Sequence, residues 1–263
     1  MKERIAECIN ILGAFCGKRD VQSLTVEQLK SKYGIEDVDV MVLFGGSIMC
    51  GGDVFADAMK HCIAKKYIIV GGCGHTTESL RVKMNTEFPD IETAGFPEAF
   101  VFEKYLEHRY GLHADFLECD STNCGNNITY LMDLLKNNKI PCKSIILAQD
   151  ATMQYRMEAG LKKYAKDVQI INFATYKANV IVKNSELLFE NEIWGMWDMD
   201  RYITLLMGEI PRLSDNADGY GPKGKNYIIH VDIPKEVEEA FLVLKEEYSG
   251  LIREANPLYA SIK

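Results

Sequence analysis

The segment 120–127 combines small polar side chains in a turn-forming order, Asp-Ser-Thr-Asn-Cys-Gly-Asn-Asn. It follows a short extended segment, 114–119, and precedes a helix whose apolar residues recur with helical spacing. Asp, Ser, Thr and Asn side chains accept hydrogen bonds from the unpaired N–H groups at the start of a helix. A helix amino terminus within such a loop can also receive an anion or a polar ligand. The segment therefore predicts a ligand site, and we expect other strand-end loops to converge beside it.

Two glycine-rich loops each follow a segment that we predict to be a buried strand. One begins directly after 38–44, and the other, Gly-Gly-Cys-Gly-His-Thr-Thr at 71–77, begins after 67–70. Glycine at the end of a strand allows the backbone to approach a ligand closely. Neither loop has the pattern G-x-G-x-x-G or G-x-x-x-x-G-K-[ST], which disfavours a standard dinucleotide site and a P-loop. The glycines of interest are Gly45, Gly46, Gly71, Gly72 and Gly74. The alternative is that they only form tight strand-to-helix turns.

The candidates for proton transfer and anion binding occupy the same kind of position. His75, in the second glycine-rich loop, can act as a general base or donate a hydrogen bond, and the alternative is a capping or surface histidine. Asp150 and Arg156 follow a third predicted strand at 144–148. An arginine in the first turn of a helix can bind a carboxylate or phosphate with two donors. It can instead form a structural ion pair with Asp150 or Asp120.

Two carboxylates remain as candidates for binding ribose hydroxyls or acting as a base. They are Asp120 and Glu98, and the alternative for both is helix capping or acid placement in a first helical turn. Nucleophilic catalysis has less support, because Cys124 lies at a predicted helix start but has no evident base partner. The four other histidines lack H-x-x-x-H spacing, so we predict no metal site.

Composition narrows the class of partner. A net charge of −8 disfavours nucleic acid or an anionic membrane surface as the main partner, which leaves a small-molecule ligand. The eight cysteines contain no C-x-x-C pair, and we expect them to be reduced thiols of a cytoplasmic protein. No stretch approaches the ~20 apolar residues of a membrane span. The sequence carries no signal for an oligomeric state.

The order of elements predicts an α/β fold. Predicted strands at 38–44, 67–70, 144–148 and 168–173 alternate with helical patterns, which indicates a mostly parallel sheet flanked by helices. Ligands of such sheets bind outside the carboxyl ends of the strands. We therefore expect one α/β domain over 34–175. The remaining segments are expected to form a smaller, mostly helical accessory region or lid, made of 1–33 plus 176–263, with a possible strand at 227–233 and a long helix at 234–251.

Several of these motifs together resemble the YdcF-like proteins, the soluble branch of a family of unknown function that also contains the SanA and ElyC envelope proteins. The resemblance covers about 38–235. It rests on 44–46, 71–76, Glu98-Ala99, 121–127, 149–154 with Arg156, Trp197, Arg201-Tyr202, 208–213, 218–224 and 230–232. Membrane-anchored relatives carry an N-terminal span that this sequence lacks. The resemblance implies a Rossmann-like domain with a helical companion, and binding of S-adenosylmethionine or another nucleotide-like ligand at the strand edge.

Under that resemblance, Asn123 and Asn127 are expected to contact polar groups of the ligand, with His75 and Arg156 nearest any chemistry. One alternative is an enzyme that acts on a phosphorylated envelope precursor, a sugar nucleotide or a lipid carrier, with Arg156 holding phosphate. A second alternative is a non-catalytic sensor whose segment 197–224 closes on a ligand.

Overall fold

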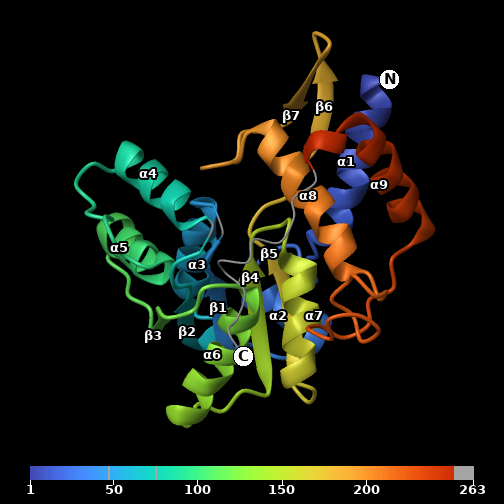
Figure 1. Cartoon of the computed structure of the whole chain (residues 1–263). Helices are drawn as coiled ribbons and strands as arrows, with labels where there is room; N and C mark the ends of the chain where they lie inside the picture. Colours follow the sequence, from blue (N-terminus) through green and yellow to red (C-terminus); the bar gives the residue numbers. More distant parts are fainter. Residues whose placement is uncertain (47, 75, 252–263) are drawn as a thin grey trace.

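A parallel sheet forms the centre of the molecule in the computed structural model, which describes residues 1–46, 48–74 and 76–251. Its strand order is β3-β2-β1-β4-β5, and every neighbouring pair is parallel. The strands are β1 (Val38–Phe44), β2 (Ala64–Val70), β3 (Phe116–Glu118), β4 (Ser144–Gln149) and β5 (Gln169–Ala174). Helices follow the strands on both faces (Figure 1), so the fold is the expected Rossmann-like α/β arrangement.

Both faces of the sheet are buried, which explains the nearly continuous apolar sequence of β1. Met41 and Leu43 point into one core with the first group of helices, whereas Val40 and Val42 point into the opposite core with the second group. The first group is α2 (Val26–Tyr33), α3 (Cys50–Lys60), α4 (Thr77–Glu87) and α5 (Glu98–Tyr110). The second group is α6 (Cys124–Asn137) and α7 (Gln154–Tyr164). Parallel strands covered in this way lack a polar face.

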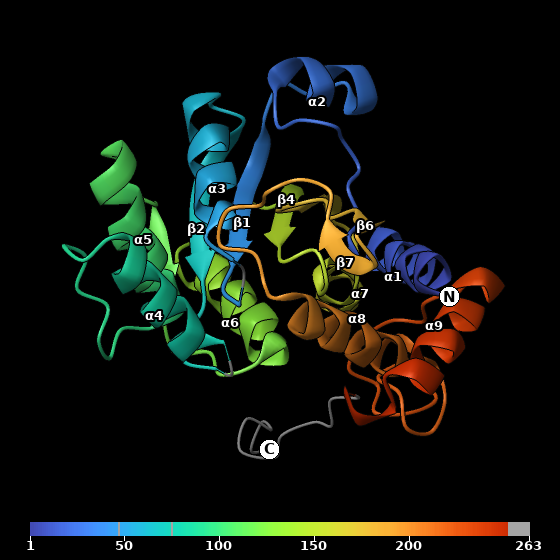
Figure 2. The ribbon, with the colours of Figure 1, turned by 90° about the horizontal axis from the view of Figure 1, so that it is seen from above.

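A further core, here called the second core, lies beside the sheet and is separate from the cores on its two faces. It joins α1 (Lys2–Cys16), α8 (Met199–Leu213) and α9 (Lys235–Glu247) with the hairpin of β6 (Val180–Lys183) and β7 (Glu186–Phe189). These elements gather at the end of the molecule opposite α4 and α5, as Figure 1 and Figure 2 both show. A short 3-10 helix, η1 (Ser249–Leu251), follows α9. Helix α2 contributes Leu29 to the core of the sheet, and the Thr25 side chain caps its amino terminus.

The segment 227–233 is not a strand, contrary to the sequence expectation. Its backbone hydrogen bonds are made elsewhere: Tyr227 and Ile228 donate to the Tyr220 carbonyl, and Ile229 donates to Ala159 on α7. The alternating apolar residues instead face the second core, where Ile228 is buried. The long C-terminal helix is also shorter than expected, since α9 ends at Glu247. Among the helices of the described residues, none combines the length and apolarity that crossing a bilayer requires.

Candidate functional site

A cleft of about 720 Å³ opens at the carboxyl edge of the sheet. It lies where the strand order reverses: after β1 the chain adds β2 and β3 on one side, and it then returns to place β4 and β5 on the other. Gly45 and Gly46 follow β1 into the cleft, and Asp150 follows β4. The Gln149 side chain joins the two strand ends by donating to the Gly45 carbonyl at 3.0 Å. Such a reversal point is the usual ligand crevice of open α/β sheets.

The cleft wall comes from both parts of the molecule. The sheet side supplies the loops after β1 and β2, the start of α5, the segment 121–129 and one face of α7. The helical side supplies Trp197 just before α8, residues of α8 itself and residues of the loop that follows it. The lining residues from that side are Trp197, Leu205, Glu209, Arg212, Tyr220, Lys225, Tyr227 and Ile228. Of the glycines expected to approach a ligand, Gly71 does not line the cleft.

Three of the glycines have a packing role that explains them without a ligand. A Cβ at Gly72 would lie 2.7 Å from the Cys119 carbonyl oxygen and closer still to that of Ser121. A Cβ at Gly71 would lie 2.9 Å from the Gly45 Cα, and one at Gly45 would collide with the Glu98 carboxylate. These contacts support the turn-and-packing alternative for these three positions. Gly46 differs, because its φ of +78° demands glycine at the cleft itself.

Glu98 is the buried acid of the cleft. Glu98 lies in the first turn of α5, and only 5% of its surface is exposed to solvent. The hydroxyls of Thr76 and Thr77 each donate to its Oε1 at 2.9 Å, and the Gly46 N–H donates to the same carboxylate. Burial raises the pKa of Glu98, whereas these hydrogen bonds lower it, and the raising effect is larger. A carboxylate can accept about four hydrogen bonds, so these three donors leave acceptor capacity on a residue that lines the cleft.

The amino end of α6 also faces the cleft. Asn123 caps the helix by accepting from the Asn126 N–H at 3.0 Å, as expected for this segment. Asn127 is only 7% exposed and lines the cleft, yet its side-chain amide makes no hydrogen bond to any other described residue. Because the residue lines the cleft, its amide is available to a polar group of a ligand. Asp120 is exposed and lies outside the cleft lining.

Asp150 lies at the cleft floor without any exposed surface. Its Oδ1 accepts from Thr152 N–H at 2.9 Å, Thr152 Oγ1 at 2.6 Å and Tyr176 O–H at 2.9 Å. Its Oδ2 accepts from Trp197 Nε1 at 2.9 Å. Burial raises the pKa of Asp150, and the four hydrogen bonds oppose that rise. The carboxyl therefore ties the chain before α8 to the end of β4.

Arg156 pairs with neither Asp150 nor Asp120, the two partners considered from the sequence. It forms a two-point ion pair with Glu209 of α8, with Nε–Oε2 at 2.5 Å and Nη2–Oε1 at 2.9 Å. The two side chains are 11% and 6% exposed. The pair lies in the cleft wall and connects α7 to α8. Glu209 is 53 residues from Arg156 in the sequence, on a helix whose placement the local pattern does not reveal.

Other expectations fall outside this geometry or are not decided by it. His75 lies outside the described residues. Cys124 lines the cleft at the first residue of α6. Within the described ranges, no group of three His, Cys, Asp or Glu side chains is placed to hold a metal ion.

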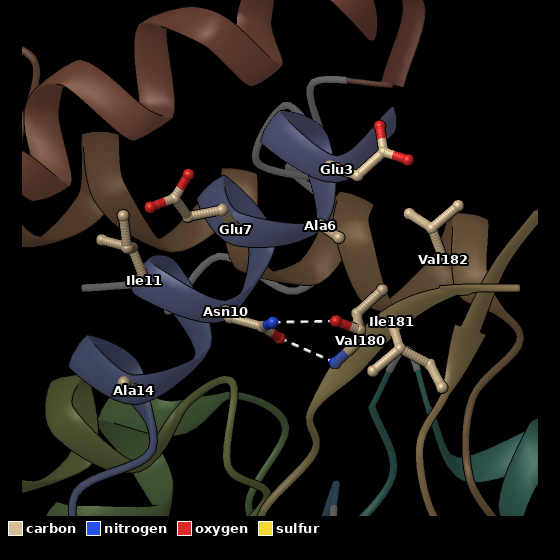
Figure 3. A pocket seen from close by; sticks show the side chains of 9 residues that line it. All are labelled: Glu3, Ala6, Glu7, Asn10, Ile11, Ala14, Val180, Ile181 and Val182. Carbon is tan, nitrogen blue, oxygen red and sulfur yellow. Dashed lines mark hydrogen bonds between the residues drawn. The ribbon is translucent and has the colours of Figure 1, made fainter. Parts of the chain in front are cut away.

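A second hollow, of about 590 Å³, lies between α1 and β6 (Figure 3). Asn10 spans it, donating to the Val180 carbonyl at 2.8 Å and accepting from the Val180 N–H at 2.7 Å. Ile181 and Val182 project from the strand beside it. The central amide of this hollow is therefore satisfied within the protein.

The sequence reasoning missed most of the wall contributed by the helical side. The missed residues are Leu205, Glu209, Arg212, Tyr220, Lys225, Tyr227 and Ile228. The signal was present, since 208–213 and 218–224 are among the motifs that resemble YdcF-like proteins. No protein-family model matches the chain.

Proposed function

We propose that this protein binds a nucleotide-like small molecule, with S-adenosylmethionine as the first candidate, in the cleft at the carboxyl edge of the sheet. The observation that carries the proposal is the coincidence of three features at the strand reversal point. These are the Gly46 turn, the Glu98 carboxylate and the unpartnered Asn127 amide. Known ligands of open α/β sheets occupy this position.

The chemistry of the wall fits a ligand with hydroxyls and a flat base. The Glu98 carboxylate would accept hydrogen bonds from vicinal hydroxyls such as those of ribose. The Asn127 amide offers both donors and an acceptor to the polar edge of a base or to an amino acid moiety. Met153 and Trp197 supply apolar surface within the same cleft for the faces of a ring.

A second candidate is an enzyme that acts on a phosphorylated substrate. Lys225 lines the cleft on its helical side, which favours an anionic group there. As part of the proposal we place the protein in the cytoplasm. All eight cysteines are free thiols in the structure, which supports a reducing compartment.

The proposal is tested by thermal denaturation with S-adenosylmethionine, S-adenosylhomocysteine, ATP, NAD and sugar nucleotides. A ligand present at about 100 times its dissociation constant adds about 2.7 kcal/mol to the unfolding free energy. For a chain of this size that corresponds to a rise in Tm of about 5–10 °C. We expect this rise with the adenosyl compounds.

Asn127→Ala supplies the site-specific control. It removes a side chain that makes no hydrogen bond to another described residue, so the fold should persist while the ligand-induced rise disappears. Asn137→Ala, at the exposed far end of the same helix, should preserve the full rise. A rise with sugar nucleotides alone would transfer support to the phosphorylated-substrate candidate.

A further inference from the structure

The cleft extends well beyond the strand edge along α7. Its lining residues on this helix and at its N-cap are Met153, Arg156, Met157, Gly160 and Tyr164. Spacings of three and four residues place them on one helical face. From Met153 to Tyr164 this face runs about 16 Å, at ~1.5 Å per residue. Two of the proposed nucleotide contacts lie at the Met153 end, since a Cβ at Gly46 would be 3.2 Å from Met153 Cε and the Gly46 N–H donates to Glu98. The Tyr164 end, farther along the helix, is here called the outer end.

Aromatic rings dominate the outer end. Tyr164 and Tyr227 line the cleft and are 50% and 57% exposed. Tyr227 packs edge-to-face against Tyr220, with ring centroids 5.2 Å apart and planes inclined at 71°. Partly exposed tyrosine rings of this kind offer flat surfaces on which a ligand ring can stack.

The outer end also carries unbalanced positive charge. Arg156 is neutralised by Glu209, its two-point partner. The Lys225 ammonium, in contrast, lines the cleft and forms no ion pair with any described acidic side chain. The nearby Asp215 carboxylate accepts from His230 and from the Lys223 N–H, and it lies outside the lining. An anionic group is therefore the complementary partner for Lys225.

The loop that holds these groups is fixed without a ligand. Lys225 N–H donates to the Gly219 carbonyl at 2.8 Å, and Tyr227 N–H donates to the Tyr220 carbonyl at 2.8 Å. A Cβ at Gly224 would collide with the carbonyl oxygens of Asn216 and Gly219, so the fold of the loop depends on glycine there. The backbone that carries Lys225 and Tyr227 is thus held in place before a ligand arrives, which reduces the entropic cost of binding.

We propose that the outer end is a second binding site, which takes a small organic anion that joins a ring to a phosphate or carboxylate group. The ring stacks on Tyr164 and Tyr227, and the anionic group meets Lys225. The inference rests on the proposed function to the extent that this anion is the second ligand, beside the nucleotide-like molecule at the strand edge.

Phenyl phosphate is the probe, because it carries both features, and inorganic phosphate and phenol carry one each. Binding is measured by ligand-observed NMR titration of the full chain. Phenyl phosphate should bind at least tenfold more tightly than either fragment. Lys225→Ala and Tyr227→Ala should each weaken phenyl phosphate at least fivefold. Lys223→Ala, an exposed lysine of the same loop, and Tyr130→Ala, an exposed tyrosine of α6 outside the cleft, should change its affinity less than twofold.

Equal losses in Lys225→Ala and Lys223→Ala would overturn the proposal, because they would indicate a general charge effect. Binding of phenyl phosphate no tighter than that of phosphate would overturn the stacking role. The proposal of a nucleotide site and the proposal of an anion site at the outer end are tested by different variants. Asn127→Ala should abolish binding of S-adenosylhomocysteine and leave phenyl phosphate unchanged. If S-adenosylhomocysteine fails to bind wild type while phenyl phosphate binds in a Lys225-dependent way, only the nucleotide proposal is lost.

Discussion

Removing one partner of the Arg156–Glu209 pair should strongly destabilise the fold. Glu209→Ala leaves the Arg156 guanidinium, 11% exposed, without its two-point partner. Removing one member of a buried ion pair costs about 3–5 kcal/mol because the remaining charge is uncompensated. We take about 3 kcal/mol, since the cleft admits some water to the remaining guanidinium. For a chain of this length that lowers Tm by about 6–12 °C.

The assay is urea denaturation at neutral pH, arranged as a double-mutant cycle. The cycle compares wild type, Glu209→Ala, Arg156→Met and the double variant. The loss of unfolding free energy in the double variant should be smaller, by at least ~2 kcal/mol, than the sum of the losses in the two single variants. Glu107→Ala is the control for an exposed pair. The Lys104 Nζ and Glu107 Oε2 atoms are 3.0 Å apart, and the two side chains are 40% and 48% exposed. It should cost less than ~1 kcal/mol. Additive losses in the cycle, or a Glu209→Ala cost as small as that of Glu107→Ala, would refute the reasoning.

Two further predictions concern the turn after β2 and the loop after α8. Gly72→Ala should destabilise the fold by about 3 kcal/mol in urea unfolding, because its Cβ would overlap the carbonyls of Ser121 and Cys119. Gly250→Ala, whose Cβ would meet no atom of the described residues within 4 Å, should stay within about 0.5 kcal/mol of wild type, and equal effects would contradict the packing argument. Hydrogen bonds to Asp215 and then Asp232 raise the pKa of His230, so its stabilising contribution is complete below about pH 6.5 and is lost as pH rises through the folded-state pKa. The Tm difference between wild type and His230→Asn should therefore shrink from pH 5.5 to pH 8.5, and a difference that grows with pH would contradict the assignment.

The sheet was predictable because its local signals agree with its packing. The apolar run 38–44 is buried on both faces, and the turn residues after each strand lie at one edge, as parallel strands require. The capping roles of Thr25 and Asn123 follow from local hydrogen bonding and were equally accessible. The strand proposed at 227–233 was wrong because its alternation reflects burial against the second core, while its backbone pairs with Tyr220 and Ala159.

The helical side of the cleft was not accessible to local reasoning. The partner of Arg156 depends on where α8 packs, and that placement is set by contacts with α1 and α9 far along the chain. The hydrogen-bond partners of Asp150 were likewise not accessible to local reasoning. Its sequence position suggested catalysis, but its four hydrogen bonds depend on Tyr176 and Trp197 as well as on the adjacent Thr152. Long-range packing therefore decides which polar side chains, like that of Asp150, have all their hydrogen bonds made within the protein.

The most direct test of the central claim is hydrogen–deuterium exchange with and without saturating S-adenosylmethionine. Amides protected by a bound ligand report its location, independently of any assayed reaction. Binding in the cleft should protect peptides that cover 121–129 and 150–157, and the hollow beside β6, covered by 3–14 and 180–182, should be unchanged. Protection confined to that hollow, or no protection at either place, would contradict the account.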